Sequence, residues 1–309
     1  MSQPVAAPRI TFAIPYYSNP GYLIEAIESV RAQSIVDWEI IVADDAGPDP
    51  AESAVAALGD HRIRYVRNPS NLGLAGNWNA SLRLARAPLV TLLHADDRIH
   101  PEYAAEVLAA AEADPRAAAL CTDATVIDGA GQLAFSLADF VKKFARRPRR
   151  THTIAGDDGL AAVLSNNYIF CPSLCYRLSH LDADPFDSAW RMVLDLDHTT
   201  RLLLRGEHLV AIRRPLYVYR RHHANQTTSL TAEATRFEEE IALYRRLTVD
   251  ATALGWRRSA GAARRHTMVR LNLTLQAATD LVARRWPAAR RKARLLAHDL
   301  RHPKAPQTP

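Results

Sequence analysis

Short apolar segments alternate with helical patterns over the first hundred residues of this 309-residue chain. Strands are predicted over residues 10–14, 39–43, 63–66 and 89–93. Between the first two, Leu23, Ile27 and Val30 are spaced four and three apart, which places them on one face of a helix. Further helices are expected over residues 77–85 and from Pro101, since proline suits the first helical turn. This alternation predicts an α/β fold with a mostly parallel sheet.

Polar residues follow three of these strands at the point where each strand ends. They are Tyr16, Tyr17 and Ser18 after the first strand, Asp44 and Asp45 after the second, and Asp96 and Asp97 after the fourth. Ligands of such sheets bind outside the carboxyl ends of the strands. The sequence therefore predicts a functional site at this edge of the sheet.

The acidic pair Asp96–Asp97 follows its apolar strand through His94 and Ala95. Adjacent carboxylates repel each other unless a cation or a hydrogen-bond network compensates them. Oxygen ligands of this kind suit Mg²⁺ or Mn²⁺, which would be shared with the phosphates of a substrate. The alternative is a helix cap, because Asp97 lies shortly before Pro101. The pair alone does not decide between the two.

The alternation of strands and helices fades after Cys121. A cationic segment over residues 134–150 is interpreted either as a solvated loop or as a mobile cover over an anionic ligand. Beyond it, helices are predicted over residues 156–164 and 195–205, and strands over residues 173–177, 209–212 and 216–220. From about Thr231 the pattern is helical and rich in arginine, with Trp256 and Trp286 as anchors.

Six segments occur in the order found in a known enzyme family. They are residues 14–33, 38–49, 71–79, 94–97, 194–202 and 219–222. Residues 38–49 read WEIIVADDAGPD, and residues 219–222 read YRRH. Over some 220 residues, from 10 to 229, the sequence resembles the inverting GT-A glycosyltransferases of family 2. The resemblance implies a GT-A fold, a mixed and mostly parallel sheet flanked by helices, over residues 1–230, followed by a helical C-terminal extension over residues 231–309.

The resemblance also implies an activity and a set of site residues. The activity is transfer of a sugar, with inversion, from a nucleotide diphosphate donor to an acceptor hydroxyl, in the synthesis of a surface polysaccharide, glycolipid or glycosylated metabolite. The implied donor contacts are Pro15, Tyr17, Asp44, Asp45, Asn71, Gly73, Asn79 and Asp96. The implied ligands of a divalent metal ion, Mg²⁺ or Mn²⁺, are Asp96, Asp97 and His222.

Asp195 is the general base that the resemblance implies. An inverting transfer needs a carboxylate opposite the leaving group to accept the proton of the attacking hydroxyl. The alternative for Asp195 is a charge that favours a helix N-terminus. Asp197 is the weaker candidate, because two positions along a helix turn its side chain to another face.

Two positions depart from the family pattern: His94 stands where the metal motif begins with an acid, and Leu194 precedes the base in place of an acid. The first departure suggests a rival, an inactive nucleotide-sugar-binding or scaffold protein, against which Asp195 counts. A nucleotidyltransferase would need a glycine-rich loop after the first strand, where this chain has PYYSN. A Rossmann dehydrogenase is disfavoured because no G-x-G-x-x-G follows any strand.

The C-terminal segment is strongly basic. Residues 251–309 contain 13 lysines and arginines against two acidic residues, a net charge of +11 in a chain whose total is +6. These helices form either a solvated cap or a peripheral contact with an anionic membrane. No nucleic-acid-binding module is recognised. The absence of a leader or a long apolar run predicts a cytoplasmic protein, with the inner face of the plasma membrane as an alternative place.

Overall fold

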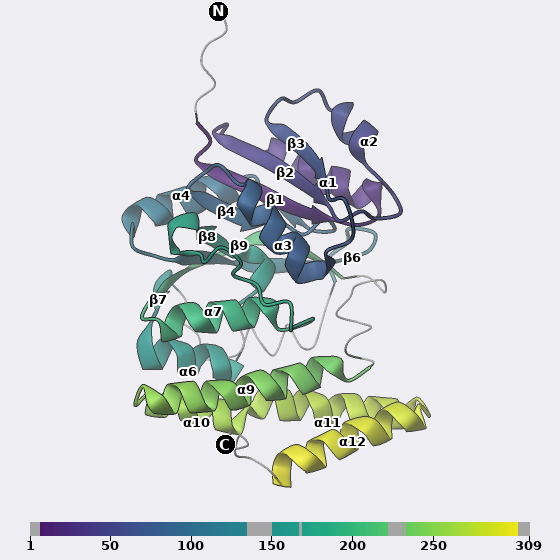
Figure 1. Ribbon diagram of the computed structural model, residues 1–309, viewed down its shortest axis with the longest axis vertical. Helices are drawn as coiled ribbons and strands as arrows, with labels where there is room; N and C mark the ends of the chain where they lie inside the picture. The colour runs from purple at the N-terminus through teal and green to yellow at the C-terminus, as the bar shows by residue number, and fades with distance from the viewer. Residues whose placement is uncertain (1–6, 135–149, 167–168, 222–230, 232, 302–309) are drawn as a thin grey trace, which may run out of the picture. The chain divides into compact units, whose positions relative to one another are not determined.

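The computed structural model describes residues 7–134, 150–166, 169–221, 231 and 233–301 (Figure 1). These residues form two compact units, and each is described by itself. The first unit comprises Met1–Thr153, Ile169–Ser188 and His208–Arg221. The second comprises Ile154–Tyr168, Ala189–Glu207 and His222–Pro309. The functional division at residue 230 stays a prediction.

The first unit is built on a mixed sheet with strand order β3-β2-β1-β4-β8-β6-β9-β5 and with β7 paired to β9. The strands are β1 (Ile10–Tyr16), β2 (Trp38–Asp44), β3 (Ile63–Arg67), β4 (Leu89–Leu92), β5 (Arg98–Ile99), β6 (Ala119–Asp128), β7 (His152–Ile154), β8 (Cys175–Arg177) and β9 (Leu209–Arg221). The first four pair in parallel, β8 is antiparallel to β4 and β6, and β5 is antiparallel to β9. The predicted mixed, mostly parallel GT-A sheet is confirmed.

The first strand continues past the predicted stop at Pro15 and ends at Tyr16. Pro15 lies beyond Ala13, the last residue of β1 that pairs with β4. Residues two apart in a strand direct their backbone N–H groups to the same side, so the nitrogen of Pro15, like that of Ala13, faces β4. Because β1 and β4 no longer pair at Pro15, the N–H that proline lacks would have had no partner in the sheet. On the β2 side the register continues to Tyr16, which lies opposite Asp44.

Helices flank this sheet. They are α1 (Pro20–Arg31), α2 (Glu52–Ala56), α3 (Gly73–Leu84) and α4 (Tyr103–Ala113). The predicted face of α1, with Leu23, Ile27 and Val30, is fully buried in a core shared with α4 and with alternate residues of β1. The side chain of Asn19 caps α1 by accepting a hydrogen bond from the N–H of Tyr22 at 3.2 Å. The helix expected from residue 77 begins four residues earlier, at Gly73.

The later strands differ from the expectation. Two strands were predicted at residues 209–212 and 216–220, whereas β9 runs unbroken through Pro215. Its register against β6 shifts on both sides of Asp123, which lies opposite Pro215, so the proline occupies an irregular point of the ladder where no regular bond is lost. The strand expected from residue 173 begins at Cys175, after a short 3₁₀ turn, and β6 itself was not predicted.

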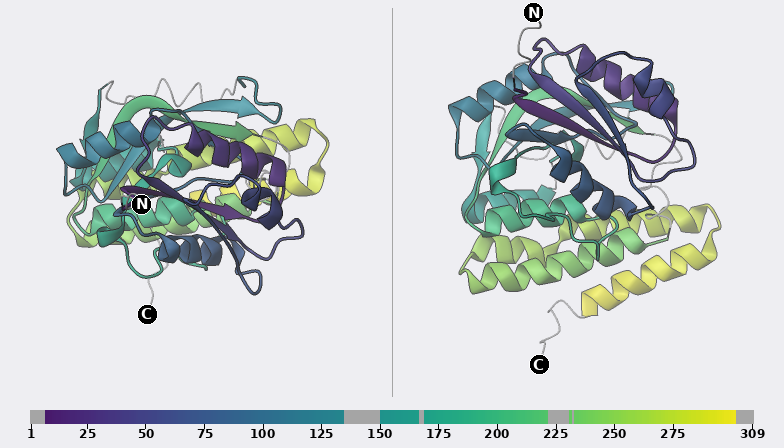
Figure 2. Two further views of the ribbon diagram at one scale, coloured as in Figure 1. Left: turned by 90° about the horizontal axis from the view of Figure 1, so that it is seen from above. Right: turned by 45° about the horizontal axis from the view of Figure 1, so that its top comes forward.

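The second unit is helical. It contains α6 (Gly156–Asn166), α7 (Leu194–Leu204), α9 (Thr235–Ala253), α10 (Arg257–Arg265), α11 (Thr267–Val282) and α12 (Trp286–Arg301). Helices α11 and α12 pack side by side as an antiparallel hairpin (Figure 2). The helical C-terminal extension is thus confirmed, but Trp286 is 52% exposed and does not anchor it. None of the described helices is long and apolar enough to cross a bilayer.

Candidate functional site

Three chain segments leave the sheet of the first unit at one edge. Tyr16, the last residue of β1, lies beside Asp44, the last residue of β2. The N–H of Leu93, just past β4, donates to the carbonyl of Ala13 in β1 at 2.9 Å. The residues that follow these three strands are therefore neighbours, and the structure brings together the polar segments that the sequence predicted there.

The segment after β4 is a tight turn. The N–H of Asp97 donates to the carbonyl of His94 at 3.1 Å, which closes a β-turn through Ala95 and Asp96. The possible ligand atoms of His94, Asp96 and Asp97 all lie within 4.8 Å of one another. The ring of His94 packs against Trp78 of α3 in a tilted arrangement, with ring centroids 5.4 Å apart. We call residues 94–97 the acidic turn.

The carboxylate of Asp97 is fixed by β9. Its Oδ2 accepts a hydrogen bond from the hydroxyl of Tyr217 at 2.8 Å, and its Oδ1 accepts one from the backbone N–H of Arg220 at 2.7 Å. The pairing of Ile99 in β5 with Tyr217 in β9 makes these distant residues neighbours. Burial of Asp97, together with the charge of Asp96, raises the pKa of Asp97 well above its ordinary value.

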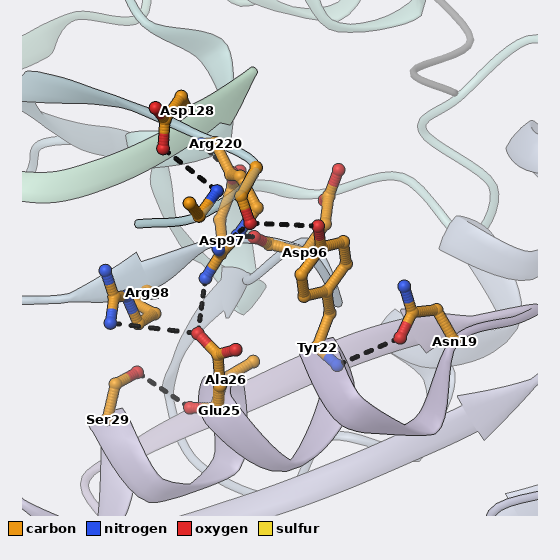
Figure 3. Close-up of polar contacts among 12 residues, drawn as sticks. Asn19, Tyr22, Glu25, Ala26, Ser29, Asp96, Asp97, Arg98, Asp128 and Arg220 are labelled. Carbon is orange, nitrogen blue, oxygen red and sulfur yellow. Dashed lines mark hydrogen bonds and ion pairs between the residues drawn. The ribbon is translucent and has the colours of Figure 1, made fainter. Parts of the chain in front are cut away.

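Arg220 is buried and links the acidic turn to α1 (Figure 3). Its Nε donates to the carbonyl of Asp96 at 2.8 Å, its Nη1 donates to the carbonyl of Gly129 at 3.1 Å, and its Nη2 pairs with Glu25 of α1. The guanidinium also lies 4.4 Å from the ring centroid of Tyr22. A single side chain thus holds the backbone of the turn, the loop after β6 and the first helix.

Asp44 and Asp45, after β2, have different surroundings. The carboxylate of Asp44 is fully buried and accepts hydrogen bonds from Tyr65, Arg67 and the N–H of Gly47. Asp44 therefore holds the loop that follows β2.

Asp45 ties the next loop to the sheet through one oxygen only. Its Oδ1 accepts from the side chain of Asn68 at 3.1 Å and from the N–H of Leu72 at 2.7 Å. Its Oδ2 accepts no hydrogen bond from the residues that the structure describes, so Asp45 keeps an oxygen that can bind a ligand.

The loops after β1 and β2 touch at Gly47. A Cβ on this residue would lie 1.6 Å from the carbonyl oxygen of Tyr17, so only glycine fits there. The ring of Tyr17 is 51% exposed, and Pro15 before it is half-buried. The close contact fixes the backbone of Tyr17 and leaves its ring open to a ligand.

The expected donor residues near α3 have structural partners. The side chain of Asn71 accepts from the N–H of Gly73 at 2.8 Å, and Gly73 adopts a φ of +73°, which glycine permits. The amide of Asn79 donates to the carbonyl of Phe186 at 2.8 Å and accepts from its N–H at 3.0 Å. Asn79 thereby fixes Phe186, which packs edge-on against Trp78.

Asp195 lies in the second unit, in the first turn of α7, and is half-buried. Its Oδ1 accepts from the N–H of Leu196 at 2.6 Å. Asp197 is buried and ion-paired with Arg201 of the same helix and with Arg246 of α9. Asp197 therefore links α7 to α9, and its weaker candidacy for the base stays a prediction. His222, the third expected metal ligand, lies outside the described residues.

Sequence reasoning missed the residues that support the acidic turn, above all Tyr217 and Glu25. Strand β5 has two residues, too few for any periodic signal, and its pairing with β9 is what brings Tyr217 to Asp97. Arg220 stood in the quoted YRRH segment, but its burial could be inferred only from its alternation with exposed Arg221.

Known proteins share this sequence pattern and fold. The family model described as glycosyl transferase family 2 matches residues 11–169. The succinoglycan biosynthesis protein ExoO of Rhizobium meliloti (strain 1021) is 30% identical over 164 residues, which are 53% of this chain and 44% of ExoO. The GalNAc(5)-diNAcBac-PP-undecaprenol beta-1,3-glucosyltransferase of Campylobacter jejuni is 36% identical over 95 residues, 30% of this chain and 31% of that protein. The chain thus spans less than half the length of either relative.

A solved structure extends the likeness to the whole fold. The crystal structure of S. aureus TarS 1-349 in complex with UDP-GlcNAc has a TM-score of 0.63 at 13% identity, covering 97% of this chain and 93% of that one. At this identity the likeness shows a shared GT-A fold. The family model, by contrast, matches more than half of the sequence and includes β1, β2, β4 and the acidic turn. The chain belongs to glycosyl transferase family 2.

Proposed function

We propose that this chain is an inverting glycosyltransferase that uses a divalent metal ion to move a sugar from a nucleotide diphosphate donor to an acceptor hydroxyl. The observation that carries the proposal is the acidic turn at the carboxyl edge of the parallel strands, in a chain of glycosyl transferase family 2. This edge is where α/β sheets bind their ligands.

The side chains of the acidic turn suit a divalent ion. Two carboxylates and an imidazole lie within reach of one another, and the imidazole of His94 favours Mn²⁺ over Mg²⁺. Burial and the neighbouring charge of Asp96 raise the pKa of Asp97. A cation bound at the acidic turn would offset the repulsion between these two carboxylates. Asp96, Asp97 and His94 would hold the ion, and His222 is proposed as a further ligand. Bound there, the ion would neutralise the charge that develops on the leaving diphosphate.

Donor binding is proposed to use the loops after β1 and β2. The open ring of Tyr17 can stack on a nucleobase, with Pro15 beside it, and the Oδ2 of Asp45 can accept a hydrogen bond from the base or the ribose. Asp44 fixes the loop of Gly47. The role proposed for Asn71, Gly73 and Asn79 is indirect: they would hold in place the backbone segments that contact the donor.

Asp195 is proposed as the base of the transfer. The acceptor oxygen would attack the anomeric carbon, the bond from that carbon to the diphosphate oxygen would break, and the carboxylate of Asp195 would take the hydroxyl proton. Its place in the first turn of α7 favours the charged carboxylate that a base requires.

The proposed setting is the synthesis of a surface polysaccharide, glycolipid or glycosylated metabolite in the cytoplasm, with peripheral contact to an anionic membrane. The names of ExoO, a succinoglycan biosynthesis protein, and of the undecaprenol-linked glucosyltransferase support a glycan or lipid-linked acceptor. Both kinds of acceptor offer the free hydroxyl that the transfer needs.

The proposal is tested by incubating the protein and Mn²⁺ with a panel of nucleotide sugars and measuring the nucleotide diphosphate released, with water in place of the acceptor. Wild type should turn over one donor class. Asp96→Ala and Asp195→Asn should each be slower by roughly a hundredfold or more. Asp184→Ala, a change at an exposed aspartate, is the control and should keep full activity. Release by Asp96→Ala or Asp195→Asn at the wild-type rate would refute the proposed roles of these residues.

A further inference from the structure

The hairpin of α11 and α12 exposes apolar and cationic side chains at its turn. Residues 281–286 read LVARRW, and all of them are exposed. Leu281 is 50% exposed, Val282 85% and Trp286 52%. Large apolar side chains gathered at one exposed turn are unusual on a protein surface that meets only water. We call residues 281–286 the hairpin tip.

An apolar stripe runs along α11 into the hairpin tip. Leu271, Leu275, Ala278 and Val282 are spaced four, three and four residues apart, so they share one face of the helix, and all are exposed. The core of the second unit uses other positions of α11, where Val269 and Leu273 are buried. The helix therefore has an inner apolar face and a second, outward one that the fold does not need.

The exposed charges of this hairpin are all positive. Arg284, Arg290 and Arg294 are exposed and form no ion pair within the part of the chain that the structure describes. The acidic residues between positions 251 and 301 are Asp280 and Asp299, and both are buried.

Both buried acids are held by basic partners. Asp280 pairs with Lys292 at 2.6 Å and Arg285 at 2.7 Å. Asp299 pairs with His266 at 2.7 Å and Arg270 at 2.8 Å. No carboxylate of the described hairpin is left to neutralise the outer arginines, so the surface attracts anions.

We propose that the hairpin tip and the stripe on α11 form a docking surface for an anionic lipid bilayer. Leu281, Val282 and Trp286 would enter the boundary between headgroups and acyl chains, where tryptophan is favoured. Arg284, Arg290 and Arg294 would meet the lipid phosphates. The surface gives the peripheral membrane contact of the proposed function a defined location, and it can be tested apart from sugar transfer.

Two other occupants fit this surface less well. A second copy of the chain would bring unpaired arginines against the same arginines, because a twofold contact apposes identical patches. A nucleic acid would satisfy the arginines but leave Leu271, Leu275 and Val282 against phosphates and water. An anionic bilayer meets both the charge and the apolar side chains.

The first test is co-sedimentation of the full chain with vesicles of phosphatidylcholine, alone and mixed with phosphatidylglycerol. Wild type should bind the mixed vesicles far more strongly than the neutral ones. Val282→Asp should lower the partition coefficient by roughly tenfold or more, because it removes a valine that would enter the bilayer and adds a charge of the wrong sign. Val36→Asp changes a valine that is 70% exposed in the first unit, and should bind as wild type does.

The second test isolates the charge. Removing Arg284, Arg290 or Arg294 as alanine variants should each weaken binding about fivefold, since a basic residue near an anionic surface contributes about 1 kcal/mol. Arg116→Ala, an exposed arginine of the first unit, is the matched control. Circular dichroism and thermal unfolding would establish that every variant is folded.

Several results with vesicles would overturn the inference. They are equal binding to neutral and anionic vesicles, no loss of vesicle binding in Val282→Asp, and a concentration-dependent oligomer of wild type that Val282→Asp dissociates in the absence of any vesicle binding. Retention of nucleic acid with no affinity for vesicles would point to the rival ligand and would equally reject a lipid surface. Turnover of nucleotide sugars in solution is unaffected by these outcomes.

Discussion

The backbone N–H of Arg220 donates a 2.7 Å hydrogen bond to the buried carboxylate of Asp97, which lies 123 positions earlier in the chain. The same arginine reaches the carbonyl of Asp96 and the carboxylate of Glu25. Strand β9 thus positions a turn that follows β4. The geometry of the proposed metal site therefore depends on this long-range link as well as on the acidic turn itself.

Arg220→Lys is predicted to weaken the site without removing a charge. A lysine ammonium cannot reproduce the planar set of donors that contacts Asp96, Gly129 and Glu25. We expect the affinity for Mn²⁺ with a nucleotide diphosphate to fall roughly tenfold to a hundredfold, as for other residues that orient metal ligands. Titration calorimetry measures this, with Arg221→Lys at the exposed neighbour as the control. An unchanged affinity in Arg220→Lys would show that the arginine has no positioning role.

Asp96 and Asp97 are predicted to differ in their effect on stability. Asp97→Ala leaves the hydroxyl of Tyr217 and the N–H of Arg220 without an acceptor, which should lower the free energy of unfolding by about 2 kcal/mol or more. Asp96→Ala removes a half-buried carboxylate and should lower the free energy of unfolding by less than Asp97→Ala does. Urea denaturation compares the two. Equal losses would mean that the turn is not held through Asp97.

The edge of the sheet was predictable because it depends on local signals. Continuous apolar runs at β1, β2 and β4 identified buried parallel strands, and the polar residues directly after them had to meet at one edge. The face of α1 followed from the spacing of Leu23, Ile27 and Val30. These features follow from the spacing of apolar residues along the chain and from the geometry of a parallel sheet.

The supports of the site were not predictable, because they depend on pairing between distant strands. Nothing local to Tyr217 or Arg220 indicates that β9 lies beside β5, and the register shift at Asp123 has no sequence period. Asp44 and Asp45 are adjacent and alike in sequence, yet their carboxylates differ in use. Gly47, Tyr65 and Arg67 donate to the two oxygens of Asp44, whereas the Oδ2 of Asp45 accepts no hydrogen bond from the residues that the structure describes. Such differences arise only from tertiary contacts.

Two substitutions in the loop after β2 are predicted to change the stability of the protein in opposite directions. Ala46 has a φ of +54°, which alanine adopts only at a cost, so Ala46→Gly should stabilise the protein by about 0.5 kcal/mol after the entropy of the unfolded chain is counted. Gly47→Ala places a Cβ against the carbonyl of Tyr17 and should lower the melting temperature clearly. Differential scanning calorimetry would measure both. Stabilisation by Gly47→Ala would contradict the observed packing of the loops.

Acid should destabilise the second unit through Asp299. Burial raises the pKa of this carboxyl, but the hydrogen bonds from His266 and Arg270 outweigh burial, so its pKa in the folded protein lies below the ordinary value. A lowered folded pKa gives stability above the unfolded pKa of about 3.9, and that stability is lost as the pH falls toward the folded pKa. Arg245 also contacts this carboxylate, at 3.1 Å.

Urea denaturation of wild type and Asp299→Asn from about pH 7 to about pH 3 tests this dependence. At neutral pH the variant should be less stable by about 3 kcal/mol, because it removes the buried negative charge that pairs with the partly buried Arg245 and Arg270. The difference should narrow as the pH falls, since wild type then loses the same charge. Asp184→Asn, at an exposed aspartate, serves as the control. A difference independent of pH would show that the charge of Asp299 does not stabilise the fold.

The most direct test of the proposed site is calorimetric titration of a panel of nucleotide diphosphates (UDP, TDP, GDP and CDP) into the protein, with and without Mn²⁺. Wild type and Asp184→Ala should bind one nucleotide tightly only when Mn²⁺ is present, and Asp96→Ala should lose this binding while remaining folded. Binding of the same nucleotide with equal affinity in Asp96→Ala, or without the ion, would contradict a metal-dependent donor site at the acidic turn.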